Sequence, residues 1–204
     1  MKNLSPKIAI FGGAFDPPTT GHTYVLSQVL NKTDVDKIIL SPDGYRNDKQ
    51  YRISMQHKAD IAKLYIQELE TLGLNVTLDT HFLEGKNNGP TTTMAVDQYF
   101  RDKYGNSIWH IFGSDVASEM SSWSGNTNQY LEKQLQKIFL ARPGYPIEAN
   151  KYGLENYEYL DTQFLENISS TIVRNMIKNK KNEVVDIIGS DEILTYIQDN
   201  NLYR

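Results

Sequence analysis

The chain contains no cysteine among its 204 residues, so disulfide bonds and thiolate metal sites are excluded. No run of about 18 apolar residues is present, and the N-terminal residues contain no apolar segment of the length found in signal peptides. Basic residues are in the minority, because 21 Lys and Arg stand against 25 Asp and Glu, for a net charge of −4. General nucleic-acid and membrane binders usually show the opposite balance. We therefore expect a cytoplasmic protein with no nucleic-acid or membrane partner, in which any phosphate site is local.

The apolar content is sufficient for one core. With 39% hydrophobic residues, a chain of this length predicts a single domain over residues 1–204, with a helical segment from about 168–204 packed on it. Short apolar runs alternate with amphipathic segments, which predicts an α/β fold: a Rossmann-like, doubly wound, mostly parallel sheet with helices on both faces. Strands are expected at 7–11, 37–40, 76–82, 107–112 and 137–141, with an edge strand at 157–161.

The most informative stretch follows the first expected strand. Gly12 and Gly13 allow a ligand to approach the backbone closely, because neither residue has a Cβ atom. Thr19 and Thr20 are both candidate N-caps for the helix that follows. The free amides and the positive dipole end of that helix would point back at the glycine turn, so we expect an anion such as a phosphate to bind there.

His22 falls in the first turn of this helix, which places an imidazole beside the expected phosphates. The positive end of the helix should also disfavour protonation of the ring. A single histidine near a helix start is often only solvated or capping, so the spacing alone leaves both roles open.

A second anion site is predicted at residues 168–174, ISSTIVR. Ser169 or Ser170 caps a helix, and Thr171 and Arg174 are three positions apart and share one of its faces. Arginine stays charged and can bind two phosphate oxygens at once. The alternative is a capped helix with a surface arginine; the first motif in the same chain favours phosphate binding.

Three cations lie in or beside the loop over residues 43–50, which leaves the carboxyl end of the second expected strand. They are Arg46, Lys49 and Arg52, and they could hold the phosphate of an acceptor, because open α/β sheets bind ligands at this edge. A solvated charged loop is the alternative.

Three further segments supply candidate site residues, and the first of them reaches the same edge. The strand expected over 107–112 delivers Gly113 and Asp115, again a glycine followed by a carboxylate. Trp123 lies in a polar loop, where an indole could stack on a flat ring or be covered by its own loop. Thr93 closes a run of three threonines that opens a helix.

Residues 12–22, GGAFDPPTTGH, resemble the signature of the nucleotidyltransferase superfamily, most closely that of the bacterial nicotinate-nucleotide adenylyltransferases. Residues 168–174 resemble the Ile-Ser-Ser-Thr-x-x-Arg segment of that family, and the similarity continues in matching order from about residue 7 to residue 203. One position departs: the family usually has His where Thr19 stands, whereas related pantetheine-phosphate and some nicotinamide-mononucleotide enzymes have Thr.

The resemblance implies transfer of the adenylyl group of ATP to nicotinate mononucleotide, which yields deamido-NAD and pyrophosphate in NAD biosynthesis, with Mg²⁺ bridging phosphate oxygens. It implies catalytic roles for His22, Thr19 and Arg174, with Thr19 in place of the usual second phosphate donor. It implies ATP binding by Gly12, Gly13, Phe15, Gly21, His22, Gly113, Asp115, Ser170, Thr171 and Arg174. It implies mononucleotide binding by Asp16, Lys49, Thr93 and Trp123.

Several alternatives stay open at this point. The same chemistry could prefer nicotinamide mononucleotide or a pantetheine phosphate, and a protein of another class, a nucleotide-binding regulator with weak catalysis, would fit the missing histidine. Asp16 could reach the metal through water or hold the turn in place. The sequence also allows a homo-oligomer.

Overall fold

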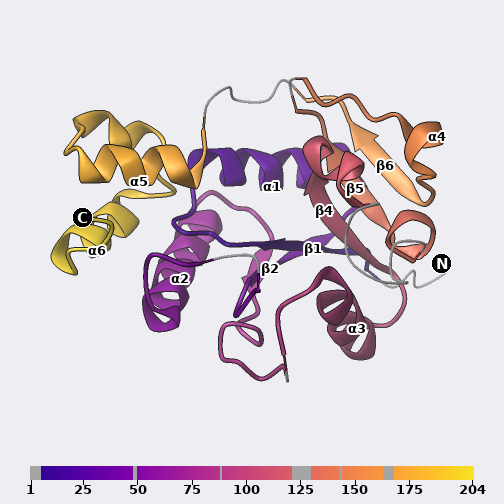
Figure 1. The fold of residues 1–204 in the computed structure, drawn as a ribbon, viewed down its shortest axis with the longest axis horizontal. Helices are drawn as coiled ribbons and strands as arrows, with labels where there is room; N and C mark the ends of the chain where they lie inside the picture. The colour runs from indigo at the N-terminus through magenta and orange to yellow at the C-terminus, as the bar shows by residue number, and fades with distance from the viewer. Residues whose placement is uncertain (1–5, 48–49, 88, 121–129, 143, 163–167) are drawn as a thin grey trace.

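The structure is a computed structural model that describes residues 6–47, 50–87, 89–120, 130–142, 144–162 and 168–204. Within these residues the chain forms a six-stranded parallel sheet in the order β3-β2-β1-β4-β5-β6 (Figure 1). The strands are β1 (Ile8–Gly13), β2 (Lys37–Pro42), β3 (Val76–Leu78), β4 (Ile108–Gly113), β5 (Lys137–Leu140) and β6 (Tyr157–Leu160). The helices are α1 (Thr20–Lys32), α2 (Met55–Thr71), α3 (Thr93–Tyr104), α4 (Ala149–Tyr152), α5 (Ser170–Lys178) and α6 (Asp191–Asp199), with short turns η1 (Ser114–Ser118), η3 (Tyr130–Gln134) and η4 (Asn182–Asp186).

Helices cover both faces of the sheet, because successive residues of a strand point to opposite sides. Ala9 of β1 belongs to the larger core cluster, together with the buried residues of α1, α2, α5 and α6. Its neighbours Ile8 and Ile10 belong to a second cluster with Val96 and Phe100 of α3. Figure 1 shows α1 and α3 on opposite sides of β1. The predicted doubly wound α/β fold is confirmed.

The strand order reverses between β1 and β4, which lie side by side at the centre of the sheet. Both strands end in a glycine, Gly13 and Gly113. In open α/β sheets, ligands bind outside the carboxyl ends of the strands at such a switch point. The topology therefore brings the first glycine motif and the Gly113–Asp115 turn to one place.

The strand expected over residues 76–82 ends earlier, at Leu78. Asp79 Oδ1 accepts a hydrogen bond of 3.0 Å from the backbone N–H of His81, which closes a turn of the kind that aspartate favours. The prediction was wrong for residues 79–82, and His81 lies in a turn instead of a strand.

Residues 168–204 lie at one end of the molecule, where α5 and α6 are seen together in Figure 1. They contact the β1–α1 turn, by which we mean residues 14–19, and the first residue of α1. Thr20 N donates to Ile187 O at 3.1 Å, and Gly189 N donates to Pro18 O at 3.1 Å. The C-terminal segment thus meets the β1–α1 turn at the predicted phosphate site.

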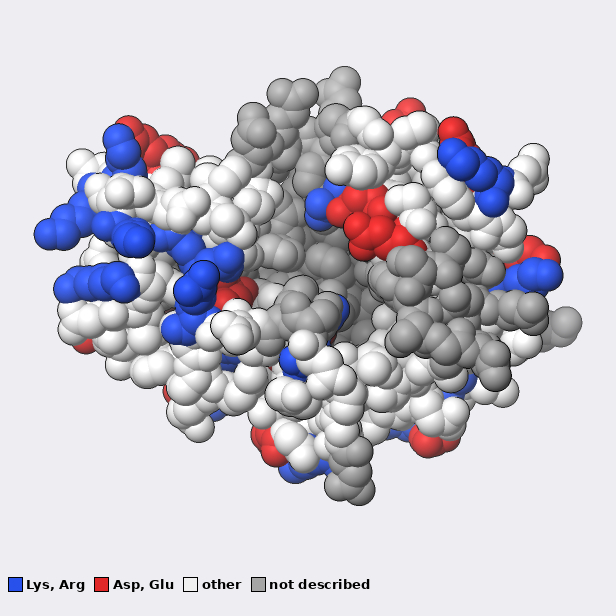
Figure 2. Space-filling view, viewed as in Figure 1, with Lys and Arg blue, Asp and Glu red and all other residues white. Residues whose placement is uncertain are grey.

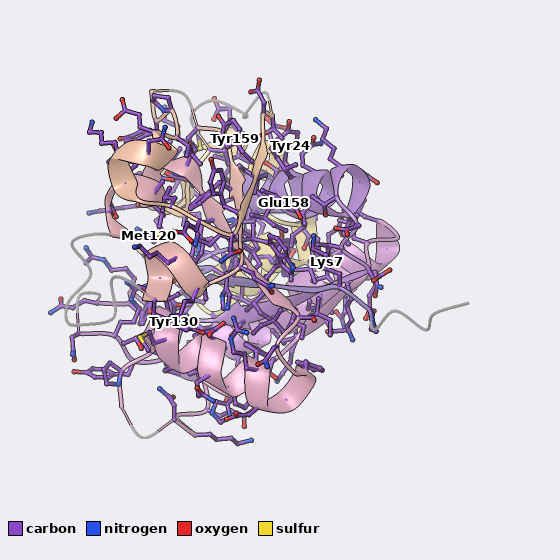
Figure 3. The ribbon with its side chains drawn as sticks, turned by 90° about the vertical axis from the view of Figure 1, so that its right-hand side faces the viewer. Lys7, Tyr24, Met120, Tyr130, Glu158 and Tyr159 are labelled. Atoms are coloured by element: carbon purple, nitrogen blue, oxygen red, sulfur yellow. The ribbon has the colours of Figure 1, made fainter. Side chains whose placement is uncertain are left out.

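The opposite end of β1 is tied down by charge. Lys7 Nζ lies 2.5 Å from Asp34 Oδ1 and 2.5 Å from Glu158 Oε1, and 4.0 Å from the ring centroid of Trp109 (Figure 3).

Among the helices of the described residues, none is long and apolar enough to cross a bilayer.

Candidate functional site

His22 is half-buried against two aromatic rings at the start of α1. Its ring centroid lies 6.0 Å from that of Phe11 and 5.1 Å from that of Phe15. Phe15 has a φ of 43°, a left-handed conformation that is uncommon without glycine. This conformation brings its ring over Gly13, where an added Cβ would lie 3.2 Å from Phe15 Cζ.

The hydrogen bonds of His22 define which ring nitrogen carries the proton. The backbone N–H of Thr19 donates to His22 Nδ1 at 3.0 Å, and the Thr19 hydroxyl lies 2.8 Å from the same nitrogen. Because a backbone N–H can only donate, Nδ1 must accept, and the proton of the neutral ring is assigned to Nε2. Burial, and next the positive charge of Arg142, lower the pKa of His22 to about 4. At pH 7 the site therefore has a neutral imidazole with an Nε2–H donor.

Thr19 is the N-cap of α1, as predicted, and only 1% of its surface is exposed. Its hydroxyl contacts the ring of His22. Direct contact between Thr19 and a phosphate stays a prediction.

Helix α5 brings the second motif to the first. Ser169 caps the helix by accepting from the N–H of Ile172 at 3.3 Å, and Ser170 Oγ donates to Pro17 O at 2.8 Å. Arg174 Nη2 donates to Thr171 Oγ1 at 2.9 Å, which confirms that these two residues share a face.

Asp16 of the first motif is bonded to the second motif. It is 4% exposed, its backbone oxygen accepts from Arg174 Nη1 at 2.6 Å, and its carboxylate Oδ1 accepts from the hydroxyl of Tyr203 at 2.6 Å. These contacts favour the second of the two roles left open by the sequence, that of holding the turn. Tyr203 was missed as a site residue, since nothing in its local sequence points to a partner 187 positions away.

At the carboxyl end of β4, Asp115 is placed by Gly113 and by an arginine that the sequence analysis did not select. Arg142 Nη1 donates to Asp115 Oδ2 at 3.0 Å. Asp115 Oδ1 is buried without a hydrogen-bond partner among the described residues, so an acceptor remains there for a ligand. A Cβ at Gly113 would lie 2.3 Å from Asp115 Oδ1 and 2.6 Å from Arg142 Nε, so a side chain there would displace both of these groups.

The loops after β2 and before α3 are joined. Gly44 N donates to Thr91 Oγ1 at 3.1 Å, and a Cβ at Gly44 would lie 2.0 Å from Phe82 O. Thr93 is the first residue of α3, capped by Thr92, whose hydroxyl accepts from the N–H of Ala95 at 3.1 Å. Lys49 and Trp123, the other two predicted mononucleotide contacts, lie outside the described residues.

The cation of this region that the sequence analysis overlooked is Lys58, which is 1% exposed. Its Nζ donates to Asp43 O at 2.5 Å and lies 3.5 Å from the ring centroid of Tyr51. Arg46 pairs with Asp43 Oδ2 at 3.0 Å. Lys58 sits on an otherwise amphipathic helix, where the pattern placed lysines on the solvent side.

Figure 2 shows this face hollowed near its centre, with Lys and Arg side chains gathered over the end that α5 and α6 occupy. Three exposed cations lie close together at the end of α5 and directly after it: Lys178, Lys180 and Lys181. No three His, Cys, Asp or Glu side chains of the described residues are grouped so as to hold a metal ion.

The cytidylyltransferase-like family model matches residues 10–176. A probable nicotinate-nucleotide adenylyltransferase from Bacillus licheniformis is 32% identical over 97% of this chain and 98% of its own length. The nicotinate-nucleotide adenylyltransferase of Bacillus subtilis is 29% identical over the same shares. In the solved structures, the Plasmodium falciparum nicotinic acid mononucleotide adenylyltransferase complexed with NaAD is 22% identical, with a TM-score of 0.79 over 97% of both chains. That likeness shows the fold, and the match of the sequence shows the family: the chain belongs to the cytidylyltransferase-like family and, within it, to the nicotinate-nucleotide adenylyltransferases.

Proposed function

We propose that the chain transfers the adenylyl group of ATP to nicotinate mononucleotide, releasing pyrophosphate and forming deamido-NAD. The observation that carries the proposal is that the starts of helices α1 and α5 meet at one turn. His22 lies in the first turn of α1, directly after the β1–α1 turn, and Arg174 of α5 donates to Asp16 O of that turn at 2.6 Å. The reaction itself is inferred from the family to which the chain belongs, and the geometry of the site fits that reaction.

In this reaction, a phosphate oxygen of the acceptor forms a bond to the α-phosphorus of ATP, while the bond from that phosphorus to the bridging oxygen breaks and pyrophosphate leaves. The acceptor is already an anionic nucleophile, so no side-chain base is required. Catalysis then depends on position and on neutralising charge as pyrophosphate departs. The Nε2–H of His22 and the guanidinium of Arg174 supply donors for that charge, with Ser170 and Thr171 at the start of α5 beside them.

The glycines and the carboxylate at the carboxyl edge of the sheet are assigned to the remaining parts of ATP. Gly12, Gly13 and Gly21 are assigned to the phosphates, because the backbone can approach a ligand closely at residues without a Cβ atom. The ring of Phe15 packs over Gly13, where an added Cβ would lie 3.2 Å from it. The unpartnered Oδ1 of Asp115 is an acceptor for the adenosine, beside Gly113.

Mg²⁺ is proposed as the counter-ion of ATP, held by phosphate oxygens and water. Asp16 is the carboxylate of the β1–α1 turn, and its Oδ1 is already bonded to Tyr203, which supports a metal with few protein ligands. When bound, the ion neutralises phosphate charge.

The test is pyrophosphate release from ATP and Mg²⁺ with nicotinate mononucleotide, nicotinamide mononucleotide and 4′-phosphopantetheine in parallel. We expect the acid mononucleotide to give the highest kcat/KM. Preference for the amide would assign the sister activity, with the roles of Lys49, Thr93 and Trp123 changed accordingly. Binding of ATP with no pyrophosphate release from any acceptor would contradict catalysis and favour a regulator.

A further inference from the structure

Tyr203 lies near the C-terminus, and the packing of the residues around it holds its hydroxyl at Asp16. Leu202, 9% exposed, belongs to the main core cluster with α6. Asn201 and Tyr203 have φ values of 52° and 61°, so the chain turns after α6, and the hydroxyl of Tyr203 reaches Asp16 in the β1–α1 turn. Burial, and next the charge of Asp16, raise the pKa of Tyr203, which keeps the hydroxyl protonated and able to donate.

Asp16 is bonded from two sides. Tyr203 donates to its carboxylate and Arg174 donates to its backbone oxygen, each at 2.6 Å. The residue before it, Phe15, packs on the ring of His22, and the residue after it, Pro17, accepts from Ser170. A displacement of Asp16 would therefore disturb both phosphate-binding groups together.

We propose that Tyr203 is a positioning residue for adenylyl transfer, which acts through Asp16 to fix the distance between His22 and Arg174. Tyr203 makes no contact with the reacting atoms in this role. The inference rests on the proposed function.

The first test compares the chain with Tyr203→Phe, which keeps the ring and removes the hydroxyl. We expect kcat to fall about 10- to 100-fold at saturating substrates, because small misplacements of catalytic groups have effects of this size. Tyr159→Phe is the matched control: this tyrosine is 42% exposed on β6 and should leave kcat unchanged (Figure 3). Rates are normalised to the folded fraction from circular dichroism.

The second test is a double-mutant cycle. Asp16→Ala removes the acceptor, so adding Tyr203→Phe to it should lower kcat less than twofold further, whereas independent effects would multiply. Asp16→Asn keeps an oxygen acceptor and should retain more of kcat than Asp16→Ala. If Tyr203→Phe alone does not fold, the comparison of Asp16→Asn with Asp16→Ala still tests whether the bond between Tyr203 and Asp16 matters for kcat.

An unchanged kcat in Tyr203→Phe, or a full multiplicative loss in the cycle, would overturn the role of Tyr203 while leaving the proposed function intact. A wild-type chain that releases no pyrophosphate would instead contradict the proposed function, and this role with it.

Discussion

A single side chain, His22, supplies a neutral donor whose tautomer is determined by the backbone of Thr19. His22→Ala removes that donor, and we expect kcat to fall about 100- to 1,000-fold, as for the loss of one oxyanion-type donor. The free energy of unfolding should fall by only about 1–2 kcal/mol, from the loss of the ring's packing on Phe15 and of its hydrogen bond from Thr19. Asn31→Ala, on an exposed position of the same helix, is the control. Equal losses of activity and folding would show that His22 is structural.

The acid limb of the pH profile follows from the same ring. With a pKa of about 4, His22 stays neutral from pH 8 down to about pH 5 and gains a proton only below that. We expect kcat to be flat between pH 6 and 8 once the acceptor phosphate is saturating. A decline centred near pH 6.5, the ordinary value for histidine, that disappears in His22→Gln would contradict this assignment.

Arg174 offers two Nη groups in one plane, already directed at Asp16 O and Thr171 Oγ1. Arg174→Lys keeps the charge and loses the planar fork, so we expect the KM for ATP to rise about 10-fold. Asn175→Ala, the exposed neighbour on α5, should leave that KM unchanged. If both variants saturate with ATP as the wild type does, Arg174 does not bind the phosphates.

At the scale of elements, Asp97 joins three of them. Its carboxylate, on α3, accepts from His110 on β4 at 2.9 Å, from Arg101 at 2.7 Å and from Tyr130 of η3. Burial raises the pKa of Asp97, but the hydrogen bonds outweigh it and lower the pKa to about 2. The folded pKa is thus below the unfolded one, so the stabilisation is complete above about pH 5 and is lost as the pH falls toward 2.

Asp97→Asn should therefore lower the free energy of unfolding by about 1–3 kcal/mol at pH 7, and by much less at pH 2.5. Denaturant titrations at both pH values provide the measurement. Asp102→Asn, exposed on the same helix, is the control. A loss for Asp97→Asn that is the same at both pH values would contradict the argument.

Most elements could be predicted because their signals are local. Ser169, one of the two candidate caps, caps α5, and the strands expected at 37–40 and 137–141 are β2 (Lys37–Pro42) and β5 (Lys137–Leu140). The contacts that assemble the site could not be predicted. Tyr203 with Asp16, or Asp97 with His110, depends on how distant segments pack, and no pattern within a helix or strand encodes such a pair.

At the scale of the whole molecule, charge is unevenly distributed. The chain carries −4 overall, yet exposed lysines follow Arg174 at the end where α5 lies. Replacing Lys178, Lys180 and Lys181 by Gln should lower kcat/KM several-fold at low salt, because these charges attract anionic substrates. The difference should vanish at about 0.5 M salt, where the interaction between charges is screened.

A matched triple variant at Lys63, Lys86 and Lys151, each exposed and paired with a carboxylate, should have little effect. If both triple variants slow the reaction equally, overall charge matters and its location does not.

Because Asp16 is bonded to residues within 168–204, the site is complete only when the end of the chain has been translated. The ribosome makes Asp16 early and Tyr203 late, and protein domains fold largely as they emerge. A nascent chain that lacks residues 168–204 has its glycine turn but neither Arg174 nor Tyr203 to fix it. We therefore expect that a chain interrupted before residue 168 does not capture ATP.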